Sequence, residues 1–475
     1  MLKSRLCIAF FAFAVGCAPA QKPLTDYVNP MLGTATLWDS VDLGFKPTKR
    51  TWGAEVFPGS SLPNAMVQVS PVTKFHSGAG YQYEDSVIYG FTHTNKGHWN
   101  LCHIPLLPVT GTPTPGDYCS PFSHERESAA PGYYQVFLDR YGVDAQLSST
   151  LRCAFHKYTY PAGAAASLLA DLQRSNEHVR AWDIRKEGDN VFAGWQQTGE
   201  KMYFYAVANR PVTGIEPVVE GDREVRIVRF GEGDGALELR IGFSFVSEKN
   251  ARENLEAEML GKSFAEVRSE ATATWNDLLG RIRVEGGTER EKGLFYSSLY
   301  RSFLWPALRS DVNGEFTDVD GKVINPGFRY YTGPSYWDDY RNKLILLGML
   351  APDVAADVIS SDTDKGEKRG GVMPTFFHGD HASAFVAGTY LRGNRGFDVN
   401  RAYNLVLRNA TVQGPSRPWL DEYIAKGYIS EMDVENPVTW TVCKAAVTKT
   451  LEYSYDDYAV ALLADALGDK ENHDM

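Results

Sequence analysis

Residues 237–243 read Leu-Glu-Leu-Arg-Ile-Gly-Phe, with an apolar residue at every second position. Because side chains of a β-strand alternate between two faces, this spacing predicts a strand with one face buried. Further along, the apolar residues recur every three or four positions, at Phe264, Val267, Ala271, Trp275 and Leu278. That spacing is typical of one face of an α-helix. The chain is therefore predicted to divide near residue 244 into a β-rich part and a helical part.

The part before residue 244 carries further strand-like stretches between turns rich in glycine and asparagine. Two of them lie at 191–195 and 202–207. A long succession of strands without alternating helices favours a large antiparallel β-sandwich over βαβ units. We place this domain at residues 21–243.

Helical periodicity governs the rest of the chain. Residues 244–287 are a predicted helical linker, and Thr288 with Glu291 supplies a capping box for the next helix. The clearest helix runs over 448–467 and is stopped by Gly468. Its predicted buried face consists of Leu451, Tyr455, Tyr458, Leu462 and Ala466. Helical hairpins in series after a sandwich suggest an α/α toroid in residues 288–475.

Length and composition limit the classes of protein that fit. The chain has 475 residues and a formal net charge of −11, and is 43% hydrophobic. A chain of this length exceeds one hydrophobic core, so two or three domains are expected. The acidic balance argues against nucleic acid as a partner, since phosphate binding needs a basic surface. No stretch beyond residue 20 is long and apolar enough to be a transmembrane segment.

Residues 1–20 have the pattern of a signal peptide. A short basic start and an apolar run at 6–15 precede Ala18-Pro19-Ala20, which matches a cleavage site. The segment around Cys17 is also close to a bacterial lipobox, so a lipid anchor at Cys17 is the alternative. The protein is expected to be exported, and to be periplasmic, at the cell surface or extracellular.

Four cysteines remain after such a cleavage, at positions 102, 119, 153 and 443. Export permits disulfides, and Cys102 with Cys119 is the first pair expected, because the two are nearest in sequence. Three full pairings nevertheless stay open. None of the four has C-x-x-C spacing, which disfavours a zinc site.

The stretch at 333–341 gathers side chains suited to binding a sugar. It reads Gly-Pro-Ser-Tyr-Trp-Asp-Asp-Tyr-Arg and leads into an apolar helix. An aromatic ring can stack on a sugar face while a carboxylate and an arginine bind hydroxyls, which makes Trp337, Asp338 and Arg341 candidate binding residues. The structural alternative is a first helical turn that carries acids because the helix dipole favours them.

A glycine-containing loop at 89–100 carries His93, His98 and Trp99. Loops on a rigid sheet often carry function, so this segment is a candidate binding loop. The two histidines have no recognisable spacing for metal ligands. Each is interpreted as a hydrogen-bonding residue.

Together, several motifs resemble glycoside hydrolase family 92, whose members are secreted bacterial exo-α-mannosidases acting on N-glycans and related mannosides. The resemblance covers nearly all of the chain after residue 20. It implies an N-terminal β-sandwich, a helical linker and an (α/α)6 catalytic domain, which is incomplete here. The matching segments are 26–34, 57–59, 90–94, 296–306, 337–341, 379–381 and 447–457.

The resemblance also implies which residues form the mannose site. Trp337 and Asp338 match positions that shape the mannose subsite, with Arg341 beside them. Asp380 and His381 match a short motif that faces the cleft.

Two further elements of the site are implied by the same resemblance. Trp99 lies in a sandwich loop expected to reach over the catalytic domain and is the candidate for stacking on the sugar. Glu452 and Asp456 lie one helical turn apart, where they serve or orient the site, and Asp456 is interpreted as structural.

The family's enzymes depend on Ca²⁺ and invert the anomeric centre. A hard cation that coordinates two sugar hydroxyls can hold a distorted mannose ring while carboxylates transfer protons. Backbone carbonyls and water supply many calcium ligands, so no protein ligand is assigned.

An inverting glycosidase needs a general acid and a general base roughly 6.5–9.5 Å apart. In the resembled family these come from a Glu-Gly-Asn-x-Trp and a Gly-Asn-Asp-Asp motif, and neither occurs in this sequence. No catalytic residue is therefore assigned. The acid and base are expected beyond Met475, and the 475-residue chain is expected to be truncated and inactive.

Two other functions compete with an α-mannosidase. One is another α/α-toroid glycosidase of the trehalase or glucoamylase type, which would release glucose rather than mannose. The other is a non-catalytic glycan-binding protein, which would bind the same sugars without turnover.

Overall fold

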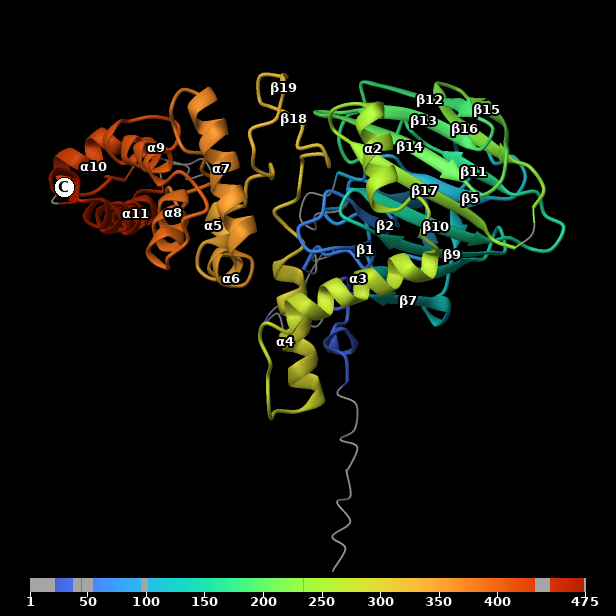
Figure 1. The fold of residues 1–475 in the computed structure, drawn as a ribbon, viewed down its shortest axis with the longest axis horizontal. Coiled ribbons are helices and arrows are strands. Elements are labelled where there is room, and N and C mark those ends of the chain that lie inside the picture. Colours follow the sequence, from blue (N-terminus) through green and yellow to red (C-terminus); the bar gives the residue numbers. More distant parts are fainter. Residues whose placement is uncertain are drawn as a thin grey trace, which may run out of the picture.

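The computed structural model describes residues 22–36, 44, 54–94, 101–233, 235–431 and 445–473. A β-rich region and a helical region lie on opposite sides of the molecule (Figure 1). The long helix α3 (Phe264–Leu279) runs below the β-rich region, and α4 (Glu289–Ser302), the first helix of the helical region, lies at the lower centre between the two.

Two large antiparallel sheets make up the β-rich region, as the sequence predicts. Seven strands form the first, in the order β1 (Ser60–Ser61), β2 (Gln68–Val72), β4 (Gly90–Thr92), β5 (Leu106–Val109), β11 (Ser167–Ala170), β16 (Arg223–Phe230) and β15 (Val212–Glu220). Eight strands form the second, in the order β12 (Ala181–Gly188), β13 (Val191–Gln197), β14 (Lys201–Ala208), β17 (Leu237–Ser244), β10 (Cys153–Thr159), β9 (Val143–Ser149), β8 (Tyr133–Leu138) and β7 (Glu127–Ala130). Short elements complete the region: β3 (Val87–Ile88) pairs with β6 (Ser120–Pro121), and two 3₁₀ turns lie at Leu24–Tyr27 and His124–Arg126.

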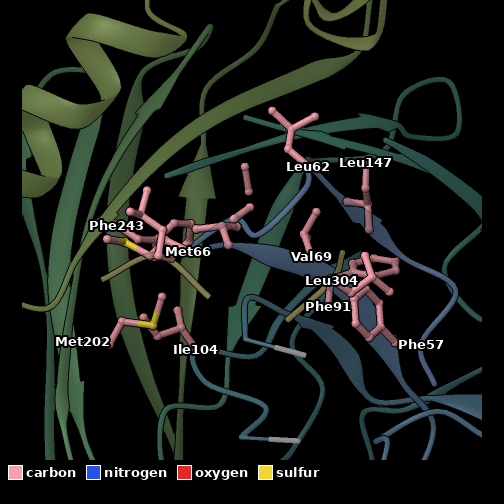
Figure 2. Close-up of a cluster of buried hydrophobic side chains, with 14 of the residues drawn as sticks. Phe57, Leu62, Met66, Val69, Phe91, Ile104, Leu147, Met202, Phe243 and Leu304 are labelled. Carbon is pink, nitrogen blue, oxygen red and sulfur yellow. The ribbon is translucent and has the colours of Figure 1, made fainter. Parts of the chain in front are cut away.

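The core of the β-rich region follows the alternation read from the sequence. The apolar residues of 237–243 are buried on β17, between β14 and β10. Figure 2 shows part of this core, where Phe57, Phe91 and Leu304 lie together. Leu304 follows the first helix of the helical region, so the hydrophobic core extends from one region into the other.

Helices α2 (Glu248–Glu258) and α3 (Phe264–Leu279) cover the eight-stranded sheet from outside. At Gly242 a β-carbon would lie 2.1 Å from the Ala251 carbonyl oxygen, so glycine is required for this close approach. Ser263 and Glu266 form a capping box at the start of α3, and the predicted apolar face of α3 is buried. The indole of Trp275 donates to the Ser61 carbonyl over 2.7 Å, which ties α3 to the sandwich.

The helical region begins with α4 (Glu289–Ser302), whose predicted capping box between Thr288 and Glu291 is confirmed. A small hairpin of β18 (Phe316–Thr317) and β19 (Val323–Ile324) follows. The remaining helices are α5 (Tyr336–Asp339), α6 (Lys343–Leu350), α7 (Pro352–Lys368), α8 (Ala382–Leu391), α9 (Val399–Thr411), α10 (Leu420–Lys426), α11 (Ala446–Leu467) and α12 (Lys470–His473). Gly468 ends α11 in the left-handed conformation, as predicted.

The predicted buried face of α11 is wrong. Leu451 and Tyr458 are 67% and 63% exposed, and Tyr455, Leu462 and Ala466 are also exposed. The buried face instead carries Lys449, Tyr453, Asp456, Val460 and Leu463. Two of these five are charged, and they are buried because Lys449 lies 2.8 Å from His378 and Asp456 bonds His381. A search for an apolar stripe cannot find a face whose charged members have partners inside the protein.

The suggested Cys102–Cys119 disulfide is also wrong, because Cys102, Cys119 and Cys153 are free thiols. Cys102 is held in the loop that bonds back to Thr94, whereas Cys119 directly precedes β6. Nearness in sequence did not bring the two sulfur atoms together. Cys443 lies outside the described residues.

No single helix in the described part of the chain is long and apolar enough to cross a membrane. Only α6 and α7 taken together pass such a test, and the chain bends by 120° between them.

Candidate functional site

Four segments of the helical region bring polar side chains together. They are the residues just after α5, the residues before α8, the loop before α10, and the first half of α11. We call the group the His381 cluster, and it consists of Tyr340, Arg341, Asp380, His381, Arg417, Glu452 and Asp456. Most of the predicted sugar-binding residues of the helical region belong to it.

His381 is the centre of the cluster and is fully buried. Its Nδ1 lies 2.9 Å from Asp456 Oδ1, and its Nε2 lies 3.2 Å from Glu452 Oε2. Its ring stacks on Tyr340, with the centroids 3.8 Å apart and the planes 13° from parallel. His381 thus lies between the two acids that the sequence places one helical turn apart, hydrogen-bonded to Asp456 and at ion-pair distance from Glu452.

Glu452 is surrounded by donors. Besides His381, the Tyr340 hydroxyl donates to it over 3.2 Å and the Arg341 guanidinium over 3.4 Å. Burial and the neighbouring Glu452 raise the pKa of Tyr340 to about 12, so Tyr340 keeps its proton and remains a donor. Glu452 therefore accepts hydrogen bonds from two side chains and lies at ion-pair distance from a third, His381. The Arg341 side chain is 54% exposed and that of Glu452 12%, so this pair links the buried cluster to solvent.

Behind this edge, Asp380 and Arg417 form a buried layer. Asp380 accepts from Asn409 and Ser383 over 3.0 Å each, and Arg417 Nε lies 3.5 Å from its carboxylate. Burial raises the pKa of Asp380 to about 7, against the opposing effect of the Arg417 cation. The Asp380 backbone N–H donates to Asp456, which fixes that carboxylate against the start of α8.

Trp337 and Asp338 stand apart from the buried charges. The Trp337 ring meets Phe377 edge to face, with centroids 5.7 Å apart, and the Arg341 guanidinium lies 5.8 Å from its centre. The indole N–H is buried without a partner among the described residues. Asp338 is exposed, whereas the neighbouring Asp339 is buried and pairs with Lys343 at 3.2 Å. The structure thus connects Trp337 to the cluster through Arg341 and leaves the Asp338 carboxylate outside it.

The predicted sandwich loop is only partly visible, because Trp99 and His98 lie outside the described residues. His93 is fully buried and hydrogen-bonded, as interpreted from the sequence. Its Nδ1 donates to the Ile104 carbonyl over 2.9 Å, and its Nε2 lies 3.0 Å from His156 Nε2. Burial lowers the pKa of His93 to about 3, so the ring is neutral and belongs to the sandwich core.

Sequence reasoning missed Arg417 and the role of Tyr340. Arg417 lies in the loop Gly414-Pro-Ser-Arg-Pro418 and is fully buried between Asp380 and Asp457. An arginine in a proline-rich loop is normally predicted to be exposed. In this sequence only the carboxylates on α11 indicate that Arg417 could be buried. Tyr340 is not among the predicted binding residues, yet its ring stacks on His381 and its hydroxyl donates to Glu452.

The described residues hold no group of three or more His, Cys, Asp or Glu side chains that could bind a metal ion. The carboxylates of the His381 cluster are instead engaged by cations, hydroxyls and N–H groups. They do not fit a resident metal ion.

A carboxylate acceptor near aromatic rings and an arginine suits a ligand rich in hydroxyl groups. Glu452 and Arg341 can bind hydroxyls, while Trp337 and the half-exposed Tyr455 offer ring faces. The groups of the cluster are therefore chemically suited to a polyhydroxylated ligand.

Comparison with known protein families gives matches from residue 27 to residue 475. Residues 27–253 match the glycosyl hydrolase family 92 N-terminal domain, and residues 250–475 match the glycosyl hydrolase family 92 catalytic domain. Among curated proteins, an uncharacterized secreted glycosidase of Arthroderma benhamiae is 24% identical over 93% of this chain and 60% of its own length.

Solved structures agree with these matches. The family GH92 α-mannosidase BT3965 from Bacteroides thetaiotaomicron is 26% identical, with a TM-score of 0.84, over 96% of this chain and 64% of its own. The inverting mannosidase BT2199 of the same organism shares the fold, with a TM-score of 0.81 and 24% identity over 95% and 63% of the two chains. The chain thus spans less than two thirds of the length of these relatives. Because the two family models together cover residues 27–475, the chain belongs to glycosyl hydrolase family 92.

Proposed function

We propose that this protein recognises terminal α-mannose on N-glycans and related mannosides, as an exo-acting, inverting α-mannosidase of its family. The observation that carries the proposal is the Glu452 carboxylate, which accepts from Tyr340 and Arg341 in a cluster bordered by the half-exposed ring of Tyr455. Similarity to BT3965 supports mannose as the sugar, since that enzyme has also been solved with mannoimidazole at 27% identity to this chain.

The proposal includes the architecture and location expected from the sequence. The helical region is part of an (α/α)6 toroid, with the sandwich packed against it. Residues 1–20 direct export, with a lipid anchor at Cys17 as the alternative, and the secreted relative supports export. The predicted signal peptide and Cys17 both lie outside the described residues.

Calcium dependence also belongs to the proposal. The side chains of the His381 cluster do not fit a metal, so ligands for Ca²⁺ would have to be backbone carbonyls, water and sugar hydroxyls. Chelation should abolish sugar binding and added calcium should restore it. Sugar binding that is indifferent to a chelator would remove the metal from the proposal.

We further propose that the cluster binds the sugar but does not transfer protons. Burial raises the pKa of Asp380, but this carboxyl is fully buried and hydrogen-bonded to Asn409 and Ser383. Glu452 and Asp456 are both already engaged by donors of the protein. The general acid and base would therefore be carboxyls outside the cluster.

An assay of residues 21–475 on α-mannosides with calcium tests these statements. We expect binding of methyl α-mannoside, no binding of methyl α-glucoside, and no sustained turnover. Trp337→Ala or Asp338→Asn should weaken binding at least tenfold, about 1.4 kcal/mol. The exposed Asp421→Asn is the matched control and should leave binding unchanged. Wild-type affinity in both site variants would move the site elsewhere.

A non-catalytic glycan-binding protein is the second candidate. It is favoured by the same carboxylates, because they are already engaged by donors of the protein. Sustained release of mannose would exclude it and would also contradict the lack of turnover expected above, whereas release of glucose would indicate another type of toroid glycosidase.

A further inference from the structure

A cleft separate from the His381 cluster lies where the sandwich meets the helical region. The turn between β13 and β14, the β18–β19 hairpin and the second half of α7 form its walls, and its volume is about 890 Å³. We call it the interface cleft. The residues that matter below are Lys201, Arg309, Tyr330 and Arg369.

The interface cleft contains polar groups that the protein does not satisfy. Tyr330 and Arg309 are 5% and 8% exposed, and neither the Tyr330 hydroxyl nor the Arg309 Nε has a hydrogen-bond partner among the described residues. The Arg309 guanidinium makes a single long contact, 3.4 Å to Glu200, and otherwise stacks on Phe245 at 4.2 Å. A buried donor left unpaired is costly, so a ligand that supplied an acceptor would be favoured.

Two further cations line the same cleft. Arg369 is exposed, and its guanidinium has no hydrogen bond or ion pair to a described residue. The Lys201 ammonium lies 3.6 Å over the ring of Trp195 and 4.9 Å over that of Tyr203, with no carboxylate partner in the described chain. These two cations have no carboxylate partner among the described residues, although the whole protein has a formal net charge of −11.

The carboxylates of the cleft, by contrast, already have partners. Asp362 accepts from the Tyr336 hydroxyl and from Lys365, and Asp318 accepts from Lys368 and two backbone N–H groups. The third carboxylate, Glu200, is 58% exposed and accepts from Arg309 over 3.4 Å. A neutral sugar needs acceptors for its hydroxyl protons as well as donors for its oxygens. A site with free donors and engaged acceptors instead favours a group that only accepts, namely a carboxylate or a phosphate.

We propose that the interface cleft binds an oxyanion, a carboxylate or phosphate carried by a sugar-sized molecule, through Arg309, Tyr330 and Arg369. Lys201 adds positive charge at the rim. The site is independent of the mannose site, because none of the His381 cluster lines it.

Isothermal titration of the full chain tests the proposal with three probes: inorganic phosphate, glucuronate and methyl α-mannoside. We expect phosphate or glucuronate to bind and Tyr330→Phe to weaken that binding about tenfold, as for a lost hydrogen bond to a charged group. Binding of phosphate alone or of glucuronate alone would support the site and identify which oxyanion it takes. Arg369→Ala should also weaken binding, and because Arg369 is exposed the variant should fold.

Tyr300→Phe is the matched control, since it removes another buried hydroxyl without a partner in the described chain, away from the cleft. Both Tyr→Phe variants should keep or raise the thermal midpoint, but only Tyr330→Phe should lose oxyanion affinity. Absence of binding by both anions would overturn the proposal. So would anion binding that Tyr330→Phe and Arg369→Ala leave unchanged, or a cleft that binds the neutral mannoside instead.

Discussion

The sandwich and the helical region each bury a histidine network, and the two networks differ in charge. In the sandwich, the Tyr158 hydroxyl contacts His156, His156 contacts His93, and His93 donates to a backbone carbonyl, so neutral rings satisfy one another. In the helical region, His381 lies between two carboxylates, with a buried arginine behind them.

The difference teaches which region supports the site and which forms it. A closed neutral network needs no ligand and stabilises a rigid scaffold. Charged groups gathered at low exposure are costly unless they are paired, and they are common at functional sites. The comparison predicts that the two regions respond differently to mutation and to pH.

The largest effect is expected from Arg417→Gln. This change leaves Asp380 and Asp457 without their buried cation, and breaking such a pair costs about 3–5 kcal/mol. Chemical denaturation, followed by the helical circular dichroism signal, measures the loss. Arg252→Gln, which breaks an exposed pair with Glu256, is the control and should leave the midpoint unchanged. Equal midpoints for both variants would mean that the charged network contributes nothing.

A pair of leucines on α11 tests which of its faces is buried. Leu463 is fully buried and Leu451 is 67% exposed. Leu463→Ala should lower the free energy of unfolding by about 2–5 kcal/mol, whereas Leu451→Ala should change it by less than about 0.5 kcal/mol. A larger loss of unfolding free energy in Leu451→Ala than in Leu463→Ala would support the face expected from the sequence and contradict the observed packing of α11.

The pH dependence should have opposite signs in the two regions. The folded pKa of His93 is lowered, so below about pH 6.5 the unfolded chain binds a proton that the folded sandwich refuses, and stability falls by about 1.4 kcal/mol per pH unit. The folded pKa of Asp380 is raised to about 7, so acidification from pH 7 towards 4 protonates the folded state first and adds stability to the helical region.

Hydrogen exchange read by mass spectrometry at pH 7 and pH 4.5, corrected for intrinsic rates, resolves the two regions. Peptides from β4 and β10 should lose protection on acidification, whereas peptides around α8 should gain protection. Asp380→Asn should remove that gain. His178→Gln, at an exposed histidine, should not alter either trend. A change of the same sign in both regions would rule out the contrast.

Sequence periodicity predicted the elements correctly where the buried residues are apolar and the exposed ones polar. The structure confirms the alternation of β17, the apolar face of α3 and the Thr288 capping box. It failed on α11, because Lys449 and Asp456 are buried through partners on other segments. No local pattern records such partners.

The candidate site was predictable only in part for the same reason. Glu452, His381 and Arg341 were named from motifs, and the structure brings them within hydrogen-bond or ion-pair distance. Arg417 was missed because its position depends on long-range contacts with Asp380 and Asp457. Trp99 stays a prediction, since it lies outside the described residues.

Equilibrium binding of methyl α-mannoside, with calcium present, tests the central claim that Glu452 in the His381 cluster recognises mannose. Wild-type protein should bind the mannoside and not methyl α-glucoside. Glu452→Gln keeps the size of the side chain but removes its charge, and should weaken binding at least tenfold, about 1.4 kcal/mol. Asp465→Asn, at an exposed acid on the same helix, should bind as wild type does. Unchanged affinity in Glu452→Gln, or equal binding of the two sugars, would contradict the claim.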